Sequence, residues 1–578
     1  MALQIEKLSR VVKSNLVLQL SVRTKIPRRS AAGIFILFAV FFSFPNCQTN
    51  KNKSVSISVE DVKESLNNEL KFSSASYLGS VDFRVPRKNS LVILPGTKVI
   101  GERQYAFNHI KQIKFPNSIT TIGKAAFAFN DISTITFSDS TVTIGEAAFI
   151  GNKLTNVTLP NSLLTIDIRA FTGNEIETLT IPQNVETIGD YAFAVNKISC
   201  VDFPLSLNKI GSWAFAGNLI TKLIIQDGTT VIGEGAFAAN RISDLTIPQS
   251  ATDIKAAAFA KNNLEHITLP LKLTTINSHL FVNNQLTEIT IPNSVVAIYE
   301  AAFAANRIEK LVVPGKVTII DSKAFADNII NTLTLPRNLK TLGSEVFINN
   351  NLQNVQLPVD LLNIGAGAFE NNNLKNIVVP ARVKSLPARC FYQNKLESAI
   401  LQSPIISFIG DYAFADNLLE RITIPSGVKH IDKHAFENNK LNSVRFLTGV
   451  VRTIDDYAFA NNQIQVVYIP TSTATIGISA FENNQLTRVS LPPSIRSIGG
   501  RAFANNKLSS LILPEYIKTV GEEAFDGNEI RSIQIGKSKV FSKNTFGLYG
   551  ESFYDFYNAN AKRSGRYTYK DDAWTYRP

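Results

Sequence analysis

Residues 152–171 read NKLTNVTLPNSLLTIDIRAF, and close copies of this stretch fill most of the chain. The phenylalanine that ends it recurs every 22 residues from Phe127 to Phe525, interrupted only by two single-residue insertions. A fixed period of about 20 to 50 residues is typical of stacked repeats. The sequence therefore predicts a solenoid of about twenty coils over residues 88–536.

Each repeat divides into two legs. Leu154, Val157 and Leu159 fit the leucine-rich repeat pattern L-x-x-L-x-L, a short strand that Pro160 ends because proline has no amide to donate. A second leg follows with an aliphatic residue such as Ile166, often a glycine that lets the backbone turn, and an Ala-Phe pair for stacking. Because 22 residues leave no room for a long helix, we expect a β-rich leucine-rich repeat solenoid. Its parallel sheet should lie on the concave face, with short turns or 3₁₀ segments elsewhere.

An asparagine stands three residues after each phenylalanine from Phe127 onward, nineteen times without exception. A turn buried inside a coil leaves backbone groups that need partners, and an asparagine amide can both donate and accept. The column therefore predicts a structural asparagine ladder rather than a row of ligand contacts. Its members include Asn152, Asn174, Asn306 and Asn484.

Residues 286–306 read LTEITIPNSVVAIYEAAFAAN. This pattern resembles the BspA-like leucine-rich repeats of bacterial surface proteins, and the resemblance covers residues 88–536. The chain departs from the family pattern by having asparagine where the family often has cysteine. The resemblance implies an exported or lipid-anchored surface protein that binds host matrix proteins or other cells.

The amino terminus has the pattern of an export signal over residues 1–46. The apolar run AAGIFILFAVFFSF, residues 31–44, follows the basic sequence KIPRR and is short for a membrane span of about 20 residues. The thirty-residue lead before it is long for a signal. Either the true start lies downstream of Met1, or the segment is retained as an anchor.

Cys47 ends the sequence SFPNC, which resembles the lipobox of bacterial lipoproteins. Phe44 replaces the leucine of the strict lipobox pattern, and Asn46 replaces its small residue. The resemblance implies a lipidated Cys47, a tether over residues 47–54 and a cell-surface or outer-membrane location. The alternative is an ordinary signal, with a secreted protein and an unused thiol.

The ends of a solenoid need covers. Residues 55–87 lack the repeat and contain the helix-like VEDVKESLNNEL, so we expect an amino-terminal cap. Residues 537–578 end in RYTYKDDAWTYRP, in which two aromatic segments could pair around a Lys-Asp-Asp turn as a hairpin cap. The alternative for this aromatic segment is a sugar-binding module.

The composition excludes several kinds of partner and chemistry. Half of the net charge of +12 lies in residues 1–46, so the remainder is too thinly spread to indicate nucleic-acid binding. His430 and His434 lack the glutamate of a zinc-protease motif, and no phosphate-binding loop or nucleophile elbow occurs. We therefore expect no enzyme, no cofactor and no metal. Cys200 and Cys390 are too many coils apart for a disulfide; Cys390 should lie in the core and Cys200 should face outward.

The outward strand positions are rich in threonine in the early coils and mixed later. Arg421, Arg445, Tyr468 and Arg488 break the repetition, and arginine and tyrosine commonly anchor protein interfaces. The leading hypothesis is an adhesin or surface binding protein that recognises a protein partner through these residues. The alternatives are a structural envelope solenoid without a ligand and, further off, an enzyme or a carbohydrate-binding protein.

Overall fold

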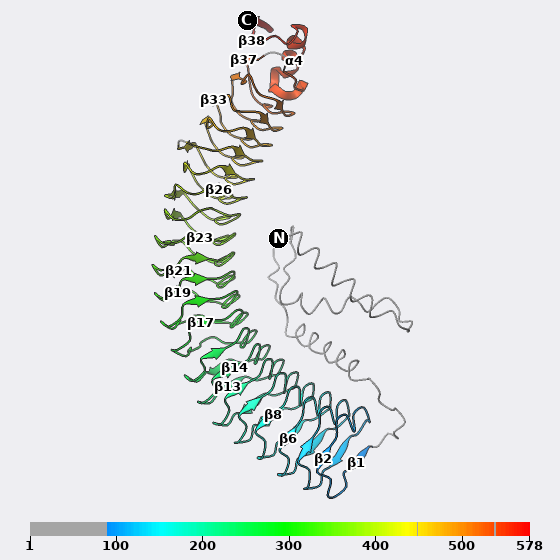
Figure 1. Ribbon diagram of the computed structural model, residues 1–578. Helices are drawn as coiled ribbons and strands as arrows, with labels where there is room; N and C mark the ends of the chain where they lie inside the picture. The colour runs from blue at the N-terminus through cyan, green and yellow to red at the C-terminus, as the bar shows by residue number, and fades with distance from the viewer. Residues whose placement is uncertain (1–88, 448, 537–538) are drawn as a thin grey trace, which may run out of the picture. The chain divides into compact units, whose positions relative to one another are not determined.

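The computed structural model describes residues 89–447, 449–536 and 539–578, which belong to one compact unit. Figure 1 shows coil stacked upon coil along this unit, each coil contributing one or two short strands. The predicted leucine-rich repeat solenoid is therefore confirmed. The predicted export signal, Cys47, the tether and the amino-terminal cap at 55–87 lie outside the described residues.

The first leg of the coil forms the first strand column. Its strands pair in parallel with the neighbouring coil in exact 22-residue register in most of the array, for example Thr178 with Cys200. Along most strands of this column the outer residues are exposed and the central one is buried or half-buried, as in β5, because side chains alternate across a strand. The column comprises β1 (Ser90–Val92), β3 (Gln112–Lys114), β5 (Thr134–Thr136), β7 (Asn156–Thr158), β9 (Thr178–Thr180), β11 (Cys200–Asp202), β13 (Lys222–Ile224), β15 (Asp244–Thr246), β19 (Lys310–Val312), β21 (Thr332–Thr334), β24 (Asn376–Val379), β25 (Ser398–Leu401), β27 (Arg421–Ile424), β29 (Ser443–Phe446), β31 (Val466–Tyr468), β33 (Arg488–Ser490), β35 (Ser510–Ile512) and β37 (Ser532–Ile535).

The second leg forms a second strand column of two-residue strands, which the repeat pattern did not predict. The aliphatic residue of each pair points into the core, and the residue before it faces outward in most coils. The column comprises β2 (Val99–Ile100), β4 (Thr121–Ile122), β6 (Thr143–Ile144), β8 (Thr165–Ile166), β10 (Thr187–Ile188), β12 (Lys209–Ile210), β14 (Val231–Ile232), β16 (Asp253–Ile254), β17 (Thr275–Ile276), β18 (Ala297–Ile298), β20 (Ile319–Ile320), β22 (Thr341–Leu342), β23 (Asn363–Ile364), β26 (Phe408–Ile409), β28 (His430–Ile431), β30 (Thr453–Ile454), β32 (Thr475–Ile476), β34 (Ser497–Ile498) and β36 (Thr519–Val520).

The second strand column is interrupted at three places, and at each of them a residue other than glycine follows the strand. It divides into four sheets, with the strand orders β2-β4-β6, β8-β10-β12-β14-β16, β17-β18-β20-β22-β23 and β26-β28-β30-β32-β34-β36. The residues after the strand at the three interruptions are Asp167, Asn277 and Pro387. Asn277 bonds the Ile254 carbonyl oxygen through its side-chain Nδ2 at 2.6 Å, and Pro387 has no amide hydrogen. Other side chains at this position leave the pairing intact, as Asp321 after β20 and Asp455 after β30 do, so the interruption is specific to these three coils.

The glycine that often follows the second strand does not serve the turn, contrary to the prediction. Its role is close approach, because a Cβ on Gly233 would lie 2.4 Å from the carbonyl carbon of Gly211. The positive φ angles fall instead two residues before and after the repeat phenylalanine, as at Tyr191 (58°) and Val195 (55°) around Phe193. The coil therefore reverses through two left-handed residues that are seldom glycine.

The repeat phenylalanines form one continuous stack through the core. All are buried, and successive rings lie nearly parallel, as for Phe171 and Phe193 with centroids 5.3 Å apart. The stack begins at Tyr105 and continues beyond the last repeat to Phe546. Each ring buries its faces against its neighbours, so every coil except the terminal ones depends on the coil on either side.

The ladder asparagines are buried and bond backbone groups rather than one another. Asn152 donates from Nδ2 to the carbonyl oxygens of Phe127 (2.9 Å) and Phe149 (3.2 Å), and its Oδ1 accepts from the Ile132 amide (3.2 Å). Asn174, Asn306 and Asn484 repeat this arrangement in their own coils. Each amide thus joins two coils at the buried turn.

The carboxyl end is a cap built from a 3₁₀ helix, η1 (Lys543–Tyr549), an α-helix, α4 (Gly550–Ala559), and a hairpin of β38 (Gly565–Lys570) and β39 (Ala573–Arg577). The hairpin turns at Asp571 and Asp572, both with positive φ, and β38 pairs antiparallel with β37. Tyr557, Tyr567 and Trp574 are buried in this cap. Phe546 at the end of the phenylalanine stack contacts the rings of Phe541 and Phe553, and Phe553 in turn contacts these three buried rings, which favours the cap over the sugar-binding module.

Candidate functional site

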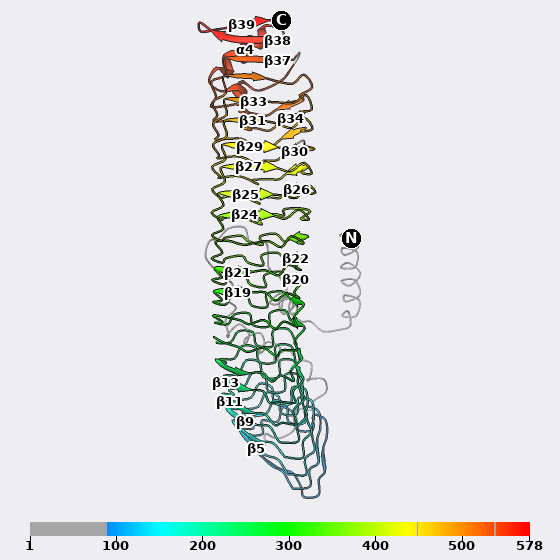
Figure 2. The same cartoon turned by 90° about the vertical axis from the view of Figure 1, so that its left-hand side faces the viewer.

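The four residues predicted to bind a partner lie on one four-stranded sheet, β27-β29-β31-β33. Arg421 begins β27, Arg445 lies in β29, Tyr468 ends β31 and Arg488 begins β33. Figure 2 shows these strands stacked in one row, on the side of the array that also presents the second strand column. The parallel register therefore brings residues that are 67 positions apart in the sequence onto one surface.

Within this sheet the four side chains occupy two adjacent outward columns. Val466 pairs with Arg488, and Arg421 pairs with Ser443, so one column contains two arginines. Arg445 pairs with Thr423, and Tyr468 follows it one coil later in the other column. We call Arg421, Arg445, Tyr468 and Arg488 the late strand face.

The late strand face is exposed and its charge is not neutralised. Tyr468 is 73% exposed, and Val466 beside it is 38% exposed. Within the described residues no ion pair joins Arg421, Arg445 or Arg488 to a carboxylate. Guanidinium groups without a partner, next to a large exposed ring, can accept carboxylates and bury apolar area when another surface covers them.

The early coils present a different outward surface. Thr134, Thr136 and Thr158 are exposed on β5 and β7, and they give small, regular contacts. Some of the charges there are paired across coils, as Lys222 with Asp244 at 3.3 Å. Others, such as Asp202 and Lys310, have no ion pair in the described residues, so what distinguishes the late strand face is its gathering of three arginines and an exposed tyrosine on one sheet.

The histidines and cysteines give no sign of a catalytic or metal centre. His434 lies between the rings of Tyr412 (4.4 Å) and Tyr457 (4.8 Å), and its Nδ1 is 2.7 Å from Glu437 Oε2, whereas His430 is exposed on β28. No group of three histidine, cysteine, aspartate or glutamate side chains in the described residues could hold a metal ion.

Both cysteines in the described residues are free, as predicted. Cys390 is fully buried in the core, where burial raises the pKa of its thiol. Cys200 is exposed at the start of β11. The Cys390 thiol therefore lacks the partly exposed, electropositive setting of a reactive cysteine.

One buried carboxyl has an unusual protonation equilibrium. Burial raises the pKa of Glu370 to about 7, although the Arg389 guanidinium lies 3.6 Å away and opposes the shift. The Glu370 side chain is only 12% exposed. The neighbouring Glu345 carboxyl adds to the rise in pKa, and the burial of Glu370 predicts a pH-dependent stability.

A second, outer asparagine ladder runs along the turn two residues after each late phenylalanine, and the sequence analysis missed it. Asn461, Asn483 and Asn505 each donate from Nδ2 to the Oδ1 of the preceding coil's asparagine, at 2.8 to 2.9 Å. The series ends on the Asp416 carboxylate through Asn438. The repeated Asn-Asn doublets in the sequence are the signal that could have revealed it.

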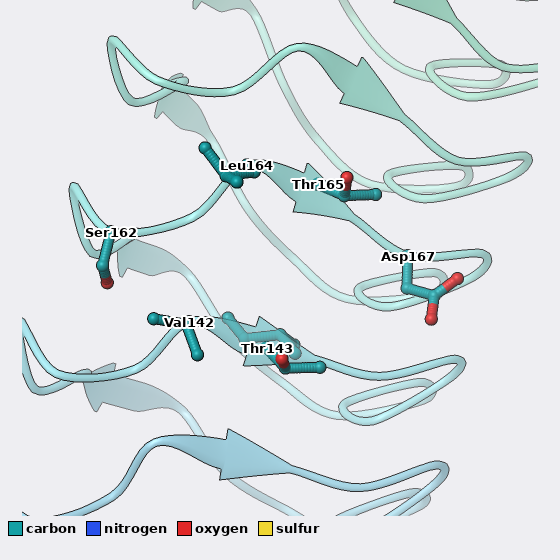
Figure 3. Close-up of a pocket in the computed structure, with 7 residues that line it drawn as sticks. Val142, Thr143, Ser162, Leu164, Thr165 and Asp167 are labelled. Atoms are coloured by element: carbon teal, nitrogen blue, oxygen red, sulfur yellow. The ribbon is translucent and has the colours of Figure 1, made fainter.

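A shallow pocket of about 280 Å³ lies at the first interruption of the second strand column. It is lined by Val142, Thr143, Ile144, Ser162, Leu164, Thr165 and Asp167. Figure 3 shows these side chains spread over two neighbouring coils, without a converging set of polar groups. The pocket belongs to the early coils, not to the late strand face.

No helix in the part of the chain that the structure describes is long and apolar enough to cross a membrane.

Known proteins resemble the chain in its repeat. The model of the BspA type leucine rich repeat region (6 copies) matches residues 98–221, 186–308, 296–408 and 407–531. A leucine rich cell surface protein from Faecalibacterium prausnitzii A2-165 is 20% identical, with 63% of this chain and 89% of that chain covered and a TM-score of 0.33. A leucine-rich repeat protein from Bacteroides ovatus ATCC 8483 is 19% identical, with 73% and 87% covered and a TM-score of 0.26. No curated protein matches the chain in sequence.

Proposed function

Because the chain belongs to the BspA-type leucine-rich repeat family, we propose that it is an exported surface protein that binds a protein partner through the late strand face. The observation that carries the proposal is the gathering of three unneutralised arginines and an exposed tyrosine on one four-stranded sheet. The partner is a host matrix protein or a protein on another cell.

Two physical features support this face over the rest of the array. Stacking requires only the inward residues of each strand, so departures from threonine at outward positions serve something other than the fold. Arginine and tyrosine contribute most to binding when a partner removes them from water, because tyrosine buries a large rigid ring and the planar arginine guanidinium can donate two hydrogen bonds to one carboxylate. The exposed Val466 adds apolar area at the same place.

The proposal includes a lipid anchor on Cys47, at the end of the apolar amino-terminal segment. Acyl chains on the mature amino terminus would hold the protein at the membrane, and residues 47–54 would tether the array away from it. This anchor would keep the protein at the membrane surface, where it can meet matrix or cells.

The alternative function is a structural envelope solenoid that fills space without a specific ligand. An enzyme is less favoured, because the sequence has no phosphate-binding loop or nucleophile elbow and no cluster of histidine, cysteine and acidic side chains in the described residues could hold a metal ion. A sugar-binding role for the aromatic cap is less favoured because most of its rings are buried.

Binding of the mature chain, residues 47–578, to immobilised fibronectin, laminin and collagen and to whole host cells separates these functions. The proposal expects saturable binding to at least one of these, with a Kd of about 1 μM or tighter. A structural solenoid would give only weak, non-saturating retention on every surface. Serum albumin at the same density is the control surface.

A further inference from the structure

A column of basic residues runs along the second leg of the late coils. The outward position just before the second-column strand is occupied by Lys429, Arg452, Arg496 and Lys518, which we call the basic column. All four side chains are exposed. The basic column lies on the same side of the array as the late strand face, but on the second leg of each coil, beside the second strand column (Figure 2).

Backbone hydrogen bonds fix these residues side by side. The Arg452 amide donates to the Lys429 carbonyl oxygen at 2.8 Å, one coil apart. Ala474 continues the series with a bond to Arg452 (2.9 Å), and Arg496 bonds Ala474 (2.8 Å). The Lys518 amide then donates to Arg496 at 2.8 Å. The backbone series is therefore continuous across five coils, in which Ala474 is the one uncharged residue.

The charge of the basic column is not neutralised within the described part of the chain. No ion pair joins Lys429, Arg452 or Lys518 to a carboxylate. Arg496 donates to the carbonyl oxygens of Pro493 (2.8 Å) and Ile495 (3.2 Å), which fixes its direction without removing its charge.

The same position is basic in fewer of the other coils, although Lys98 and Lys384 are also exposed there without an ion pair to a carboxylate of the described residues. Lys340, an earlier basic member, lies 3.4 Å from Asp360 and is thereby paired. Most earlier coils have an uncharged side chain at the position: Thr120, Val142, Leu164, Asn208, Thr230, Thr252, Thr274, Val296 and Thr318. Since those coils stack equally well, the basic residues are not required by the fold.

We propose that the basic column binds a linear anionic polysaccharide lying along the stacking direction. Coils repeat at about 4.8 Å, so the cations stand at multiples of this spacing in a single file. A polymer with a sulfate or carboxylate on each repeating sugar matches such a file, because both charge patterns are periodic. This inference does not depend on the proposed protein-binding function of the late strand face.

The side chains beside the basic column favour a polysaccharide over a single-stranded nucleic acid. Thr453, Thr475 and Ser497 occupy the neighbouring outward position, and their hydroxyl groups can bond sugar hydroxyls. A groove for single-stranded nucleic acid instead places aromatic rings where successive bases stack. The three coils offer hydroxyl groups at that position. One exposed ring, Tyr516, lies 5.8 Å from the Arg496 guanidinium, but a single ring is not the row of rings on which successive bases would stack.

The test measures binding of residues 47–578 to dextran sulfate, to polygalacturonate, to uncharged dextran and to single-stranded poly-dT. The variant changes Lys429, Arg452, Arg496 and Lys518 to Gln. The matched control removes four exposed cations elsewhere, by changing Lys209, Arg241, Arg307 and Lys316 to Gln. A Lys429→Arg, Lys518→Arg double variant keeps the charge and should bind as the parent chain does.

We expect salt-dependent, saturable binding to dextran sulfate or polygalacturonate. The polymer that binds more tightly shows whether the ligand's charged group is a sulfate or a carboxylate. At about 50 mM salt the basic-column variant should raise the Kd at least about tenfold, and the slope of log Kd against log salt should fall by about four. The control should change the Kd less than about threefold. Thermal midpoints of all variants should agree.

Three outcomes would overturn the inference. Equal loss in the variant and the control would assign the binding to diffuse net charge. Tighter binding of poly-dT than of either anionic polysaccharide would indicate a nucleic-acid surface. Binding to uncharged dextran alone, or to none of the polymers, would show that the basic column has no polyanion ligand.

Discussion

Asn306 donates from its side-chain Nδ2 to the carbonyl oxygen of Phe281, one coil earlier, at 2.9 Å. The same nitrogen reaches the Phe303 carbonyl oxygen (3.1 Å), and Asn306 Oδ1 accepts from the Leu286 amide (3.0 Å). One buried amide therefore satisfies backbone groups of two coils. This relationship, repeated along the array, is why the asparagine never varies.

Replacing Asn306 by Leu should lower the free energy of unfolding by about 2 to 5 kcal/mol, because several buried backbone groups lose their partner at about 1 to 3 kcal/mol each. Urea denaturation followed by circular dichroism measures the change, and amide hydrogen exchange should accelerate first in the coils around residue 306. Asn293→Leu, the same change at an exposed corner, is the control. An unchanged midpoint for Asn306→Leu would remove the structural role of the ladder.

The close approach of neighbouring coils at the glycine after the second strand predicts a second effect on stability. In Gly233→Ala the new Cβ would lie 2.4 Å from the Gly211 carbonyl carbon, so the coils must move apart, at about 1 to 3 kcal/mol. Gly315→Ala is the control, because nothing lies within 4 Å of its Cβ, and it should be neutral or slightly stabilising. Equal urea midpoints for the two variants would contradict the close-approach role.

Stability should also depend on pH through Glu370. Its pKa of about 7 lies above that of an unfolded-state glutamate, so the folded protein binds the extra proton and loses stability as the pH rises toward and through 7. Between pH 5 and pH 8 the free energy of unfolding, measured by urea denaturation, should therefore fall less for Glu370→Gln than for the parent chain. The difference between the two falls should be up to about 2 kcal/mol. Glu265→Gln, at an exposed position, is the control. Parallel pH profiles for the parent and Glu370→Gln would exclude the effect.

Lipidation of Cys47 predicts that a tagged fatty acid fed to expressing bacterial cells is incorporated into the chain. Cys47→Ser should abolish the label, because the thiol is the attachment point. The protein should then move from the membrane fraction to the soluble or secreted fraction. Label at the same level in both chains, or in neither, would indicate an ordinary secreted protein or an uncleaved anchor.

The sequence predicted those parts of the fold that depend on one residue type in a strict period. The phenylalanine and asparagine columns are such cases, since every coil needs the same large ring and the same amide. The second strand column was missed because each strand has only two residues, as Thr165–Ile166, too few for an alternating pattern. The role assigned to glycine was wrong because close approach between coils is a three-dimensional contact, which a single repeat does not reveal.

The candidate site was predictable only in part. Outward positions follow from alternation along a strand, so Arg445 and Tyr468 could be placed on the surface from the sequence. Whether a charge has a partner depends on the side chains of the neighbouring coils. The unpaired state of the basic column and of the late strand face therefore became visible only in the structure.

The measurement that tests the central claim most directly is partner binding by a triple variant of the late strand face, with Arg445, Tyr468 and Arg488 changed to Thr. The matched control changes Arg307, Lys310 and Val312 to Thr, which removes two cations and one exposed apolar side chain from an earlier coil. Both variants should keep the parent's urea midpoint. We predict that the late variant raises the Kd for the captured partner at least about thirtyfold, since anchor residues contribute about 2 kcal/mol or more each, while the control binds as the parent does. Undiminished binding by the late variant, with loss in the control, would contradict the assignment of function to the late strand face.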